Sequence, residues 1–331
     1  MREPSATGRE THTGGVSRRG LLRAATVLTG TAGGAALTVG TPPAHASPRP
    51  DADADRPTFV IVHGSNGNAQ SYAQLVAGLA MAGHHALAVD LPGHGSAANF
   101  PLSYQAPQDL DALATEPSPV LAETTLGDNV RHVTQVVRRA ARHGPVVLVG
   151  HSMGGATITG VANEVPDLIS RLVYLTAFCC VRLRSVFDYV LTPEAGTPPV
   201  IPGVGDPERL GVNRTNWRSA DPEFLTAAKA ALAENYDDNA FRSILNTFEP
   251  DESALVPLDD ARSDTTTWGR VPRSYIRCTL DRTIPLALQD RMIREADEAT
   301  PGNRFDVHLL EAPHVGPESP EPLVEILGDL G

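Results

Sequence analysis

Six short runs of apolar, largely β-branched residues recur along the chain, and segments with helical spacing separate most of them. The runs are apolar throughout instead of alternating, which is typical of strands that are buried on both faces of a sheet. Such runs in alternation with helices predict one α/β domain with a mostly parallel sheet of about six strands and helices on both faces. The predicted strands are 58–63, 85–90, 145–150, 171–178, 273–280 and 304–310.

Residues 179–272, between the fourth and fifth predicted strands, carry few strand signals. This segment is proline-rich at first and has helical spacing later. Because so long an excursion within a strand–helix series is uncommon as a plain loop, we expect an inserted cap over the sheet. The sequence then predicts a single domain over 58–331. The expected helices of cap and core are 71–81, 126–140, 156–163, 223–234, 238–248 and 321–330.

The N-terminal residues show the pattern of an export signal. Arg18-Arg19 lies directly before a weakly apolar stretch, and Ala44-His45-Ala46 is a small-residue processing site. We expect a twin-arginine signal over 1–46, a disordered linker over 47–57 and a secreted or extracytoplasmic location; a disordered basic tail is the alternative. The apolar stretch is too interrupted to serve as a stable membrane anchor.

Composition and motifs narrow the classes of ligand. The net charge of −12 provides no electrostatic footprint for nucleic acid or anionic lipid. The sequence contains no H-E-x-x-H pattern, no paired Cys/His spacing, and no G-x-G-x-x-G or Walker pattern before a helix. We therefore expect neither a metal nor a nucleotide cofactor.

Three cysteines occur in the chain, Cys179, Cys180 and Cys278. An odd number excludes a fully paired disulfide framework within one chain. Both cysteine segments are predicted to be core strands, so we expect buried free thiols. A bond from Cys179 or Cys180 to Cys278 is the alternative if their strands are adjacent.

The motif Gly150-His151-Ser152-Met153-Gly154 matches the G-x-S-x-G pattern, directly after an apolar strand and at the start of a helix. A tight strand-to-helix turn exposes a nucleophilic hydroxyl and leaves room only for glycine two residues before and after it. The helix N-terminus then points at developing negative charge. The setting predicts Ser152 as a nucleophile on such a turn.

Serine needs a base to accept its proton. Two histidines follow Ser152 in the chain, His308 and His314. His308 lies inside a predicted strand, where its side chain would point into the packing of the sheet. His314 follows that strand in the loop 311–316, at the end where active-site loops gather, and it is the predicted base.

The acid that orients the base is expected just past the preceding strand. Asp281 comes directly after the strand 273–280 and before Pro285, where a helix is expected to begin. Asp306 lies inside the last strand, and Asp259, Asp260 and Asp264 belong to the cap or its linker. Asp281 is therefore the predicted acid.

Acyl transfer also needs backbone donors for the oxyanion that forms on the substrate. One is expected to be the amide of Met153, the residue after the nucleophile, and the other the amide of Ser65 in the loop after the first strand. His63 and His94 lie in loops bounded by glycine and are interpreted as hydrogen bonders that shape those loops.

Four motifs together carry a resemblance to a known group. They are the segments 59–64 (FVIVHG), 90–95 (DLPGHG), 150–155 (GHSMGG) and 275–285 (YIRCTLDRTIP). From Thr58 to the C-terminus the chain resembles the α/β-hydrolase branch of plant methyl-ester esterases, hydroxynitrile lyases and bacterial pyrethroid-type esterases. The resemblance implies the α/β-hydrolase fold and a serine esterase.

The resemblance also separates chemistries within that branch. The lyases carry a lysine directly after the catalytic histidine and a threonine after the first-strand histidine, whereas this chain has Val315 and Gly64 there. Epoxide hydrolases and haloalkane dehalogenases of the wider fold use an aspartate nucleophile, where this chain has Ser152. The resemblance implies hydrolysis of a small or medium carboxylic ester, lactones included, through an acyl-enzyme. Lyase, cofactor-free haloperoxidase or perhydrolase chemistry and a non-catalytic ligand-binding receptor are the alternatives.

Overall fold

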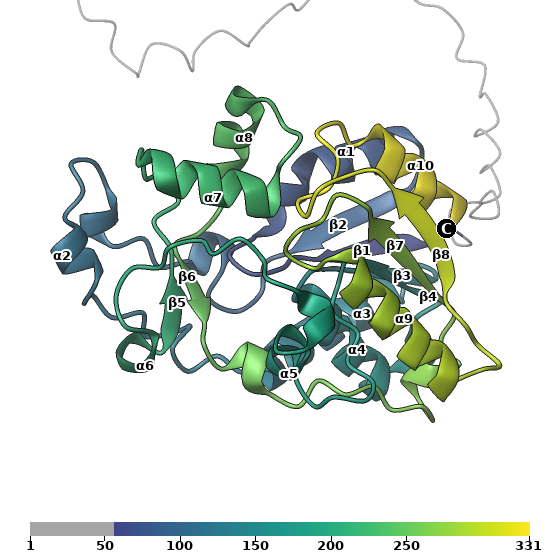
Figure 1. Ribbon diagram of the computed structural model, residues 1–331. Helices are drawn as coiled ribbons and strands as arrows, with labels where there is room; N and C mark the ends of the chain where they lie inside the picture. Colours follow the sequence, from purple (N-terminus) through teal and green to yellow (C-terminus); the bar gives the residue numbers. More distant parts are fainter. Residues whose placement is uncertain (1–55) are drawn as a thin grey trace, which may run out of the picture. The chain divides into compact units, whose positions relative to one another are not determined.

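The computed structural model describes residues 56–331. The predicted export signal, 1–46, and the linker through residue 55 lie outside the described residues. All six predicted strands are confirmed, and they form one parallel sheet in the order β2-β1-β3-β4-β7-β8 (Figure 1). Their bounds are β1 Thr58–Val62, β2 His85–Val89, β3 Val146–His151, β4 Arg171–Leu175, β7 Arg273–Cys278 and β8 Asp306–Leu310.

The strand order reverses direction at β1. The chain first adds β2 on one side of β1 and then returns to place β3 on the other, so that Val60 pairs with both Leu87 and Leu148. The loops that leave the carboxyl ends of β1 and β3 therefore diverge, and such a switch point is where open α/β sheets bind ligands. Both predicted motifs, the loop after His63 and the turn at Ser152, lie at this point.

Alternate residues of each central strand supply the two halves of the core. Val60 and Val62 of β1 belong to the half of the core that contains residues of α3, α4 and α9, while Phe59 and Ile61 belong to the half that contains residues of α1 and α10. Since both faces of the central strands are covered, a polar side chain there would cost free energy, which explains their continuous apolar runs. The helices are α1 Ala73–Met81, α3 Leu126–Ala140, α4 Gly154–Glu164, α9 Leu286–Ala299 and α10 Glu321–Asp329.

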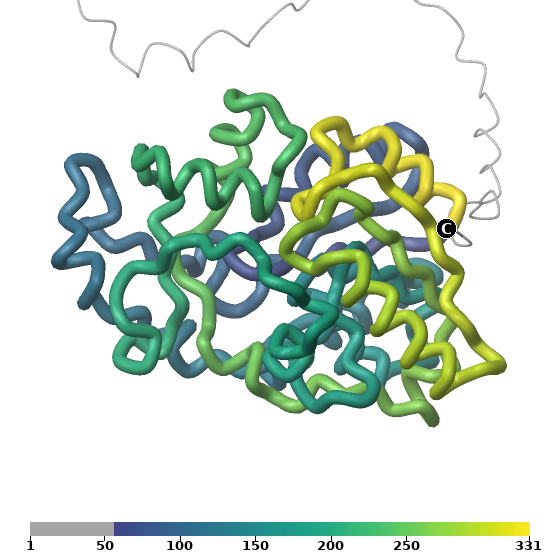
Figure 2. Tube along the Cα trace, in the orientation of Figure 1, coloured from purple at the N-terminus to yellow at the C-terminus, as the bar shows by residue number. Residues whose placement is uncertain are grey.

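The helices begin and end close to the predicted residues. Thr125 and Asp128 form a capping box that fixes the start of α3, with the Thr125 amide donating to Asp128 at 3.0 Å. The start of α1 differs from the prediction, since residues 69–72 form a 3-10 turn before the helix. α1 and α10 are far apart in sequence and lie side by side (Figure 2).

The segment between β4 and β7 holds several short elements, and we refer to residues 179–272 as the cap segment. Its helices are α5 Val186–Val190, α6 Pro207–Leu210, α7 Pro222–Leu232 and α8 Asp238–Leu245. It also contains an antiparallel pair, β5 Val212–Arg214 and β6 Asp251–Ser253, which the sequence did not predict. Both strands have three residues with several polar side chains, so neither shows an apolar pattern. A tertiary contact holds the two strands together, because Arg214 and Asp251 lie opposite each other and form a buried ion pair at 2.5 Å.

Two further details differ from the sequence prediction. β4 ends at Leu175 and not at Phe178, because Thr176 adopts a positive φ of 36° that turns the chain out of the sheet. His308 does not point into sheet packing: β8 is an edge strand, and the His308 side chain is half-buried beside Asp306. Between residues 56 and 331, no helix is long and apolar enough to cross a membrane.

Candidate active site

Ser152 lies on a strained turn between β3 and α4. Its φ is 54°, a left-handed value that costs energy for a residue with a side chain. The turn is tight because Gly154 approaches the end of β1, where a Cβ on Gly154 would lie 2.6 Å from the carbonyl oxygens of Val62 and His63. The requirement for glycine at residue 154 therefore follows from close packing of the turn against the neighbouring strand, whereas a Cβ on Gly150 would meet the backbone of Gly154 at 2.8 Å.

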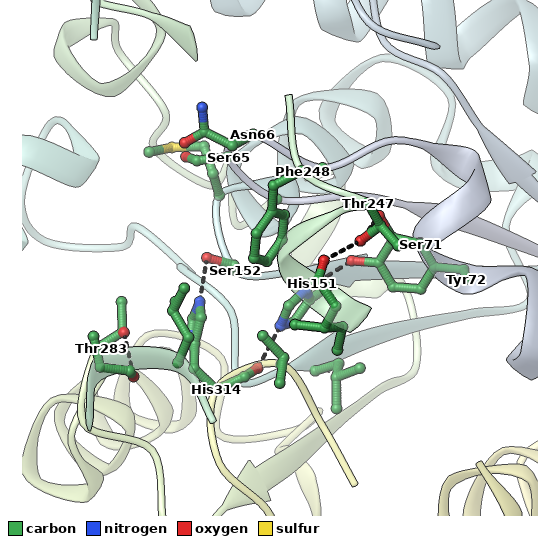
Figure 3. A pocket seen from close by; sticks show the side chains of 18 of the residues that line it. Ser65, Asn66, Ser71, Tyr72, His151, Ser152, Thr247, Phe248, Thr283 and His314 are labelled. Carbon is green, nitrogen blue, oxygen red and sulfur yellow. Dashed lines mark hydrogen bonds between the residues drawn. The ribbon is translucent and has the colours of Figure 1, made fainter. Parts of the chain in front are cut away.

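Ser152, His314 and Asp281 form one chain of hydrogen bonds (Figure 3 shows its first link). His314 Nε2 lies 3.0 Å from Ser152 Oγ, and His314 Nδ1 lies 2.7 Å from Asp281 Oδ2. An ionised carboxylate only accepts, so Nδ1 carries the proton and Nε2 is left to accept from the serine hydroxyl. Three loops after β3, β7 and β8 thus bring together the three residues that the sequence singled out, and all three are buried.

Asp281 is held by more groups than His314 alone. The amides of Thr283 and Ile284 donate to its Oδ1 at 2.7 and 2.8 Å, and the Thr176 hydroxyl donates to its Oδ2. Burial alone would raise the pKa of Asp281, but the His314 ring and these donors outweigh burial and leave the pKa lowered. Asp281 is therefore ionised at neutral pH. Sequence reasoning missed Thr176, although its place at the end of β4, next to β7, was a usable signal.

His151, which directly precedes Ser152 in the motif, forms a hydrogen bond to the loop that carries His314. Its Nε2 lies 2.8 Å from the carbonyl oxygen of His314, and its Nδ1 lies 2.7 Å from the Tyr72 hydroxyl (Figure 3). A carbonyl can only accept, so Nε2 carries the proton and Tyr72 donates to Nδ1. Burial, followed by the neighbouring His314, lowers the pKa of His151 to about 3, so the ring is neutral. Nothing in the sequence indicated that Tyr72 would reach this site.

The loop after β1 passes directly over the nucleophile. A Cβ on Gly64 would lie 2.6 Å from Ser152 Cβ and 3.2 Å from its Oγ, so a side chain at residue 64 would collide with the serine. Ser65 and Met153, whose amides were predicted to bind the oxyanion, line the same cavity as Ser152 and His314. Met153 is also the N-cap of α4, where backbone amides have no partner within the helix.

The two loop histidines behave as the sequence predicted. His63 donates from Nδ1 to the Gly64 carbonyl at 2.8 Å and accepts the Leu91 amide at Nε2, which makes it neutral. Burial, with His94 next, lowers the pKa of His63 to about 4. His94 bonds Glu249 through Nδ1 at 2.8 Å. Neither histidine is among the residues that line the cavity.

A cavity of about 810 Å³ opens above Ser152, between the core and the cap segment. This volume is in the range of sites for drug-sized ligands. Its walls are largely apolar, and polar groups gather near the serine (Figure 3). The apolar lining from the cap segment includes Phe187, Trp217, Leu232, Ile244 and Phe248.

The cysteines take no part in this site. Cys179, Cys180 and Cys278 are free and buried, which confirms the expectation of unpaired thiols. Burial raises the pKa of Cys179 to about 12, so its reactive thiolate is scarce at neutral pH. Across residues 56–331, no three side chains of the metal-binding types come together as a possible metal site.

The other aspartates that follow Ser152 and were considered as the acid do not contact His314. Asp259 accepts the Leu126 amide at 2.8 Å and so caps the start of α3, while Asp260 pairs with Arg262. Asp264 accepts the amide of Thr266, and Asp306 lies on the edge strand β8. The structure brings only Asp281 of this set to His314.

Comparison with known proteins agrees with this architecture. A pyrethroid hydrolase of Sphingobium wenxiniae is 26% identical over 241 residues, which cover 72% of this chain and 75% of that protein. Methylesterase 9 of Arabidopsis thaliana is 24% identical over 255 residues, 72% of this chain and 85% of that protein. The crystal structure of a pyrethroid hydrolase from Sphingobium faniae JZ-2 has a TM-score of 0.57 at 22% identity, covering 83% of this chain and 96% of that one.

These relatives are of the kinds that the sequence motifs resembled, and the solved structure confirms the predicted fold. The sequence profile of the alpha/beta hydrolase family matches residues 59–326, nearly all of the part of the chain that the structure describes. The chain therefore belongs to the alpha/beta hydrolase family.

Proposed function

We propose that this chain hydrolyses a carboxylic ester of small or medium size, lactones included, through an acyl-enzyme on Ser152. The observation that carries the proposal is the hydrogen-bonded series Ser152–His314–Asp281, of which Ser152 and His314 line the cavity. The names of the relatives, a pyrethroid hydrolase and a methylesterase, support the same chemistry.

The reaction has two halves. In the first, Ser152 Oγ attacks the ester carbonyl carbon while His314 Nε2 takes the hydroxyl proton, and the carbonyl oxygen becomes an oxyanion that the Ser65 and Met153 amides bind. The tetrahedral adduct expels the alcohol, which receives the proton from His314. In the second half, water loses a proton to His314 and attacks the acyl carbon. The adduct then breaks the bond between the acyl carbon and Ser152 Oγ, which takes the proton back from His314 as the acid is released. Asp281 keeps the imidazole in the required tautomer throughout.

The cavity supports esters whose groups are mainly apolar. Its walls carry aromatic and aliphatic side chains, including Phe178, Phe248 and Leu323, so a polar or charged group placed against them would lose hydration without gaining a hydrogen-bond partner there. A Cβ on Gly64 would collide with Ser152, which is consistent with ester cleavage and not with the lyase pattern at residue 64.

The test is turnover of aryl esters of increasing acyl length by the wild-type protein and by Ser152→Ala. We expect hydrolysis that Ser152→Ala reduces at least about 10³-fold, together with labelling of Ser152 by a fluorophosphonate. Activity unchanged by the substitution would contradict the mechanism. Labelling without ester turnover would point to the alternatives, with cyanide release from a cyanohydrin identifying a lyase.

We also propose that residues 1–46 direct export by the twin-arginine route and leave the protein secreted or extracytoplasmic. Arg18-Arg19 and the Ala44-His45-Ala46 site support this. Expression of the full chain and of an Arg18→Lys/Arg19→Lys variant, followed by cell fractionation, tests it. We expect the variant to accumulate uncleaved inside the cell; equal export of both proteins would contradict the proposal.

A further inference from the structure

The loop that carries the Ser65 amide is a tight turn, which we call the oxyanion loop (residues 64–67). The Gly67 amide donates to the Gly64 carbonyl at 3.2 Å, and Asn66 has a positive φ of 57°. Asparagine tolerates this conformation better than most residues, but the turn still stores strain. Something outside the loop must therefore hold Asn66 in place.

The cap segment holds it with three hydrogen bonds. The Asn66 amide donates to Glu252 Oε2 at 2.8 Å, the Asn66 side chain donates to the Glu249 carbonyl at 2.8 Å, and the Glu249 amide donates to the Asn66 carbonyl at 2.9 Å. Glu252 belongs to β6, and Glu249 lies just before it. The first of these bonds holds the peptide group between Ser65 and Asn66, which is next along the chain to the peptide group that carries the Ser65 N–H.

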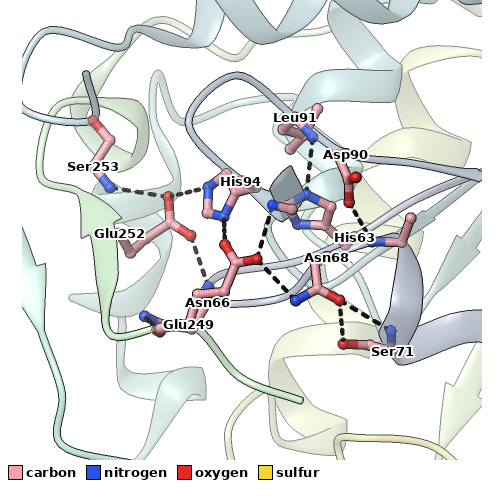
Figure 4. A network of polar contacts seen from close by, with 12 residues as sticks. His63, Asn66, Asn68, Ser71, Asp90, Leu91, His94, Glu249, Glu252 and Ser253 are labelled. Carbon is pink, nitrogen blue, oxygen red and sulfur yellow. Dashed lines mark hydrogen bonds and ion pairs between the residues drawn. The ribbon is translucent and has the colours of Figure 1, made fainter. Parts of the chain in front are cut away.

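The two glutamates are fixed in turn by the core (Figure 4). Glu249 accepts from His94 Nδ1 at 2.8 Å and, at Oε1, from the Gly95 amide at 2.8 Å and the Asn68 side chain at 2.9 Å. Glu252 lies 3.8 Å from His94 Nε2. A protonated His94 between two carboxylates balances charge that would otherwise be buried unpaired.

We propose that Glu252 is a positioning residue for the oxyanion hole, so that strand β6 of the cap segment sets the orientation of the Ser65 amide. The proposal rests on the proposed esterase function. Glu252 is not among the residues that line the cavity, whereas Ser65 and Asn66 are, so Glu252 acts on the substrate only through the loop. A cap segment that only covered the site would not need a hydrogen bond from Glu252 to Asn66, the residue directly after the oxyanion donor Ser65.

Three substitutions of Glu252 separate the effect of its side-chain length from the effect of its negative charge. Glu252→Asp keeps the charge but withdraws the acceptor from the Asn66 amide, Glu252→Gln removes the charge but keeps an acceptor oxygen within reach, and Glu252→Ala removes both. We expect Glu252→Asp and Glu252→Ala to lower kcat about 10- to 100-fold with KM within about twofold, and Glu252→Gln to stay within about threefold of wild type. The affinity for a trifluoromethyl ketone, which forms an oxyanion on Ser152, should fall with kcat.

Glu234→Ala is the matched control, because Glu234 also joins the cap segment to the core, through an exposed ion pair with Arg282 at 3.1 Å. We expect its kcat to equal that of wild type. The proposal is overturned if Glu252→Asp keeps full kcat while Glu252→Gln loses it, or if Glu252→Ala matches Glu234→Ala. If Glu252→Ala does not fold, the comparison of kcat between Glu252→Asp and Glu252→Gln still tests the proposal.

Wild type and Ser152→Ala are assayed alongside these variants. An inactive wild type refutes the esterase function, whereas an active wild type with a higher kcat for Glu252→Asp than for Glu252→Gln refutes only the role of Glu252.

Discussion

At the scale of single residues, Gly64 lies directly against the side chain of the nucleophile Ser152. We expect Gly64→Ala to lower kcat/KM by at least about 100-fold, because the new methyl group would lie 2.6 Å from Ser152 Cβ and displace the nucleophile. Gly302→Ala is the control, since a Cβ there meets no atom within 4 Å. Steady-state kinetics on an aryl ester provides the measurement; equal activity of the two variants would show that the loop can move aside.

The second prediction at this scale concerns Thr176, whose hydroxyl holds the carboxylate of Asp281. Thr176→Ala removes a hydroxyl that donates to the Asp281 carboxylate, and a hydrogen bond to a charged group is worth about 1.5–3 kcal/mol. We expect kcat to fall roughly tenfold at unchanged KM, because Asp281 then stabilises the imidazolium of His314 less well. Thr176→Ser keeps the hydroxyl and should stay close to wild type. A similar loss in both variants would assign the effect to packing and not to the hydrogen bond.

At the scale of elements, the β5–β6 pair depends on a buried charge pair. Arg214 donates to both oxygens of Asp251 and also to the carbonyls of Leu113 and Glu116, which ties the pair to the chain near α2 (Leu110–Leu113). We expect Asp251→Ala to lower the free energy of unfolding by about 3–5 kcal/mol, since it leaves a buried guanidinium without its counter-ion. Chemical denaturation monitored by tryptophan fluorescence measures this.

The control for that prediction is an exposed ion pair. Arg182 and Glu298 pair on the surface with both side chains at least half exposed, so Glu298→Ala should cost less than about 1 kcal/mol. A loss for Asp251→Ala no larger than that for Glu298→Ala would mean that the Arg214 carbonyl partners suffice to hold the two strands together.

At the scale of the whole molecule, we expect the stabilisation that His94 contributes between the cap segment and the core to depend on pH. Burial alone would lower the pKa of His94, but Glu249 and Glu252 outweigh burial and raise it to about 10, against an ordinary value of 6.5. His63, the other titratable ring facing it, stays neutral. A raised folded-state pKa stabilises fully below about pH 6.5, and the stabilisation is lost as the pH rises through about 10.

We therefore expect the free energy of unfolding to decrease steadily between pH 7 and pH 10. Urea denaturation at a series of pH values gives the measurement, and His94→Gln, which cannot titrate, should show a flatter dependence over the same range. Equal slopes for the two proteins would mean that His94 is not charged in the folded state.

The sequence by itself determined the six parallel strands, the turn at Ser152, and which acid and which histidine would lie beside that serine, namely Asp281 and His314. These features are local or follow from chain order: apolar runs report burial on both faces, and the loops after parallel strands meet at one edge of the sheet. The glycines at 150 and 154 likewise follow from close backbone contacts within the turn and with β1.

Only the tertiary structure decided which groups surround those residues. Tyr72 meets His151, Thr176 meets Asp281, and Glu252 meets Asn66 across 186 residues of chain. Each contact joins polar groups from segments that lie far apart in the chain. Periodicity records whether a face is buried, but a hydrogen bond depends on distances that exist only once the sheet, the cap segment and the loops have packed together.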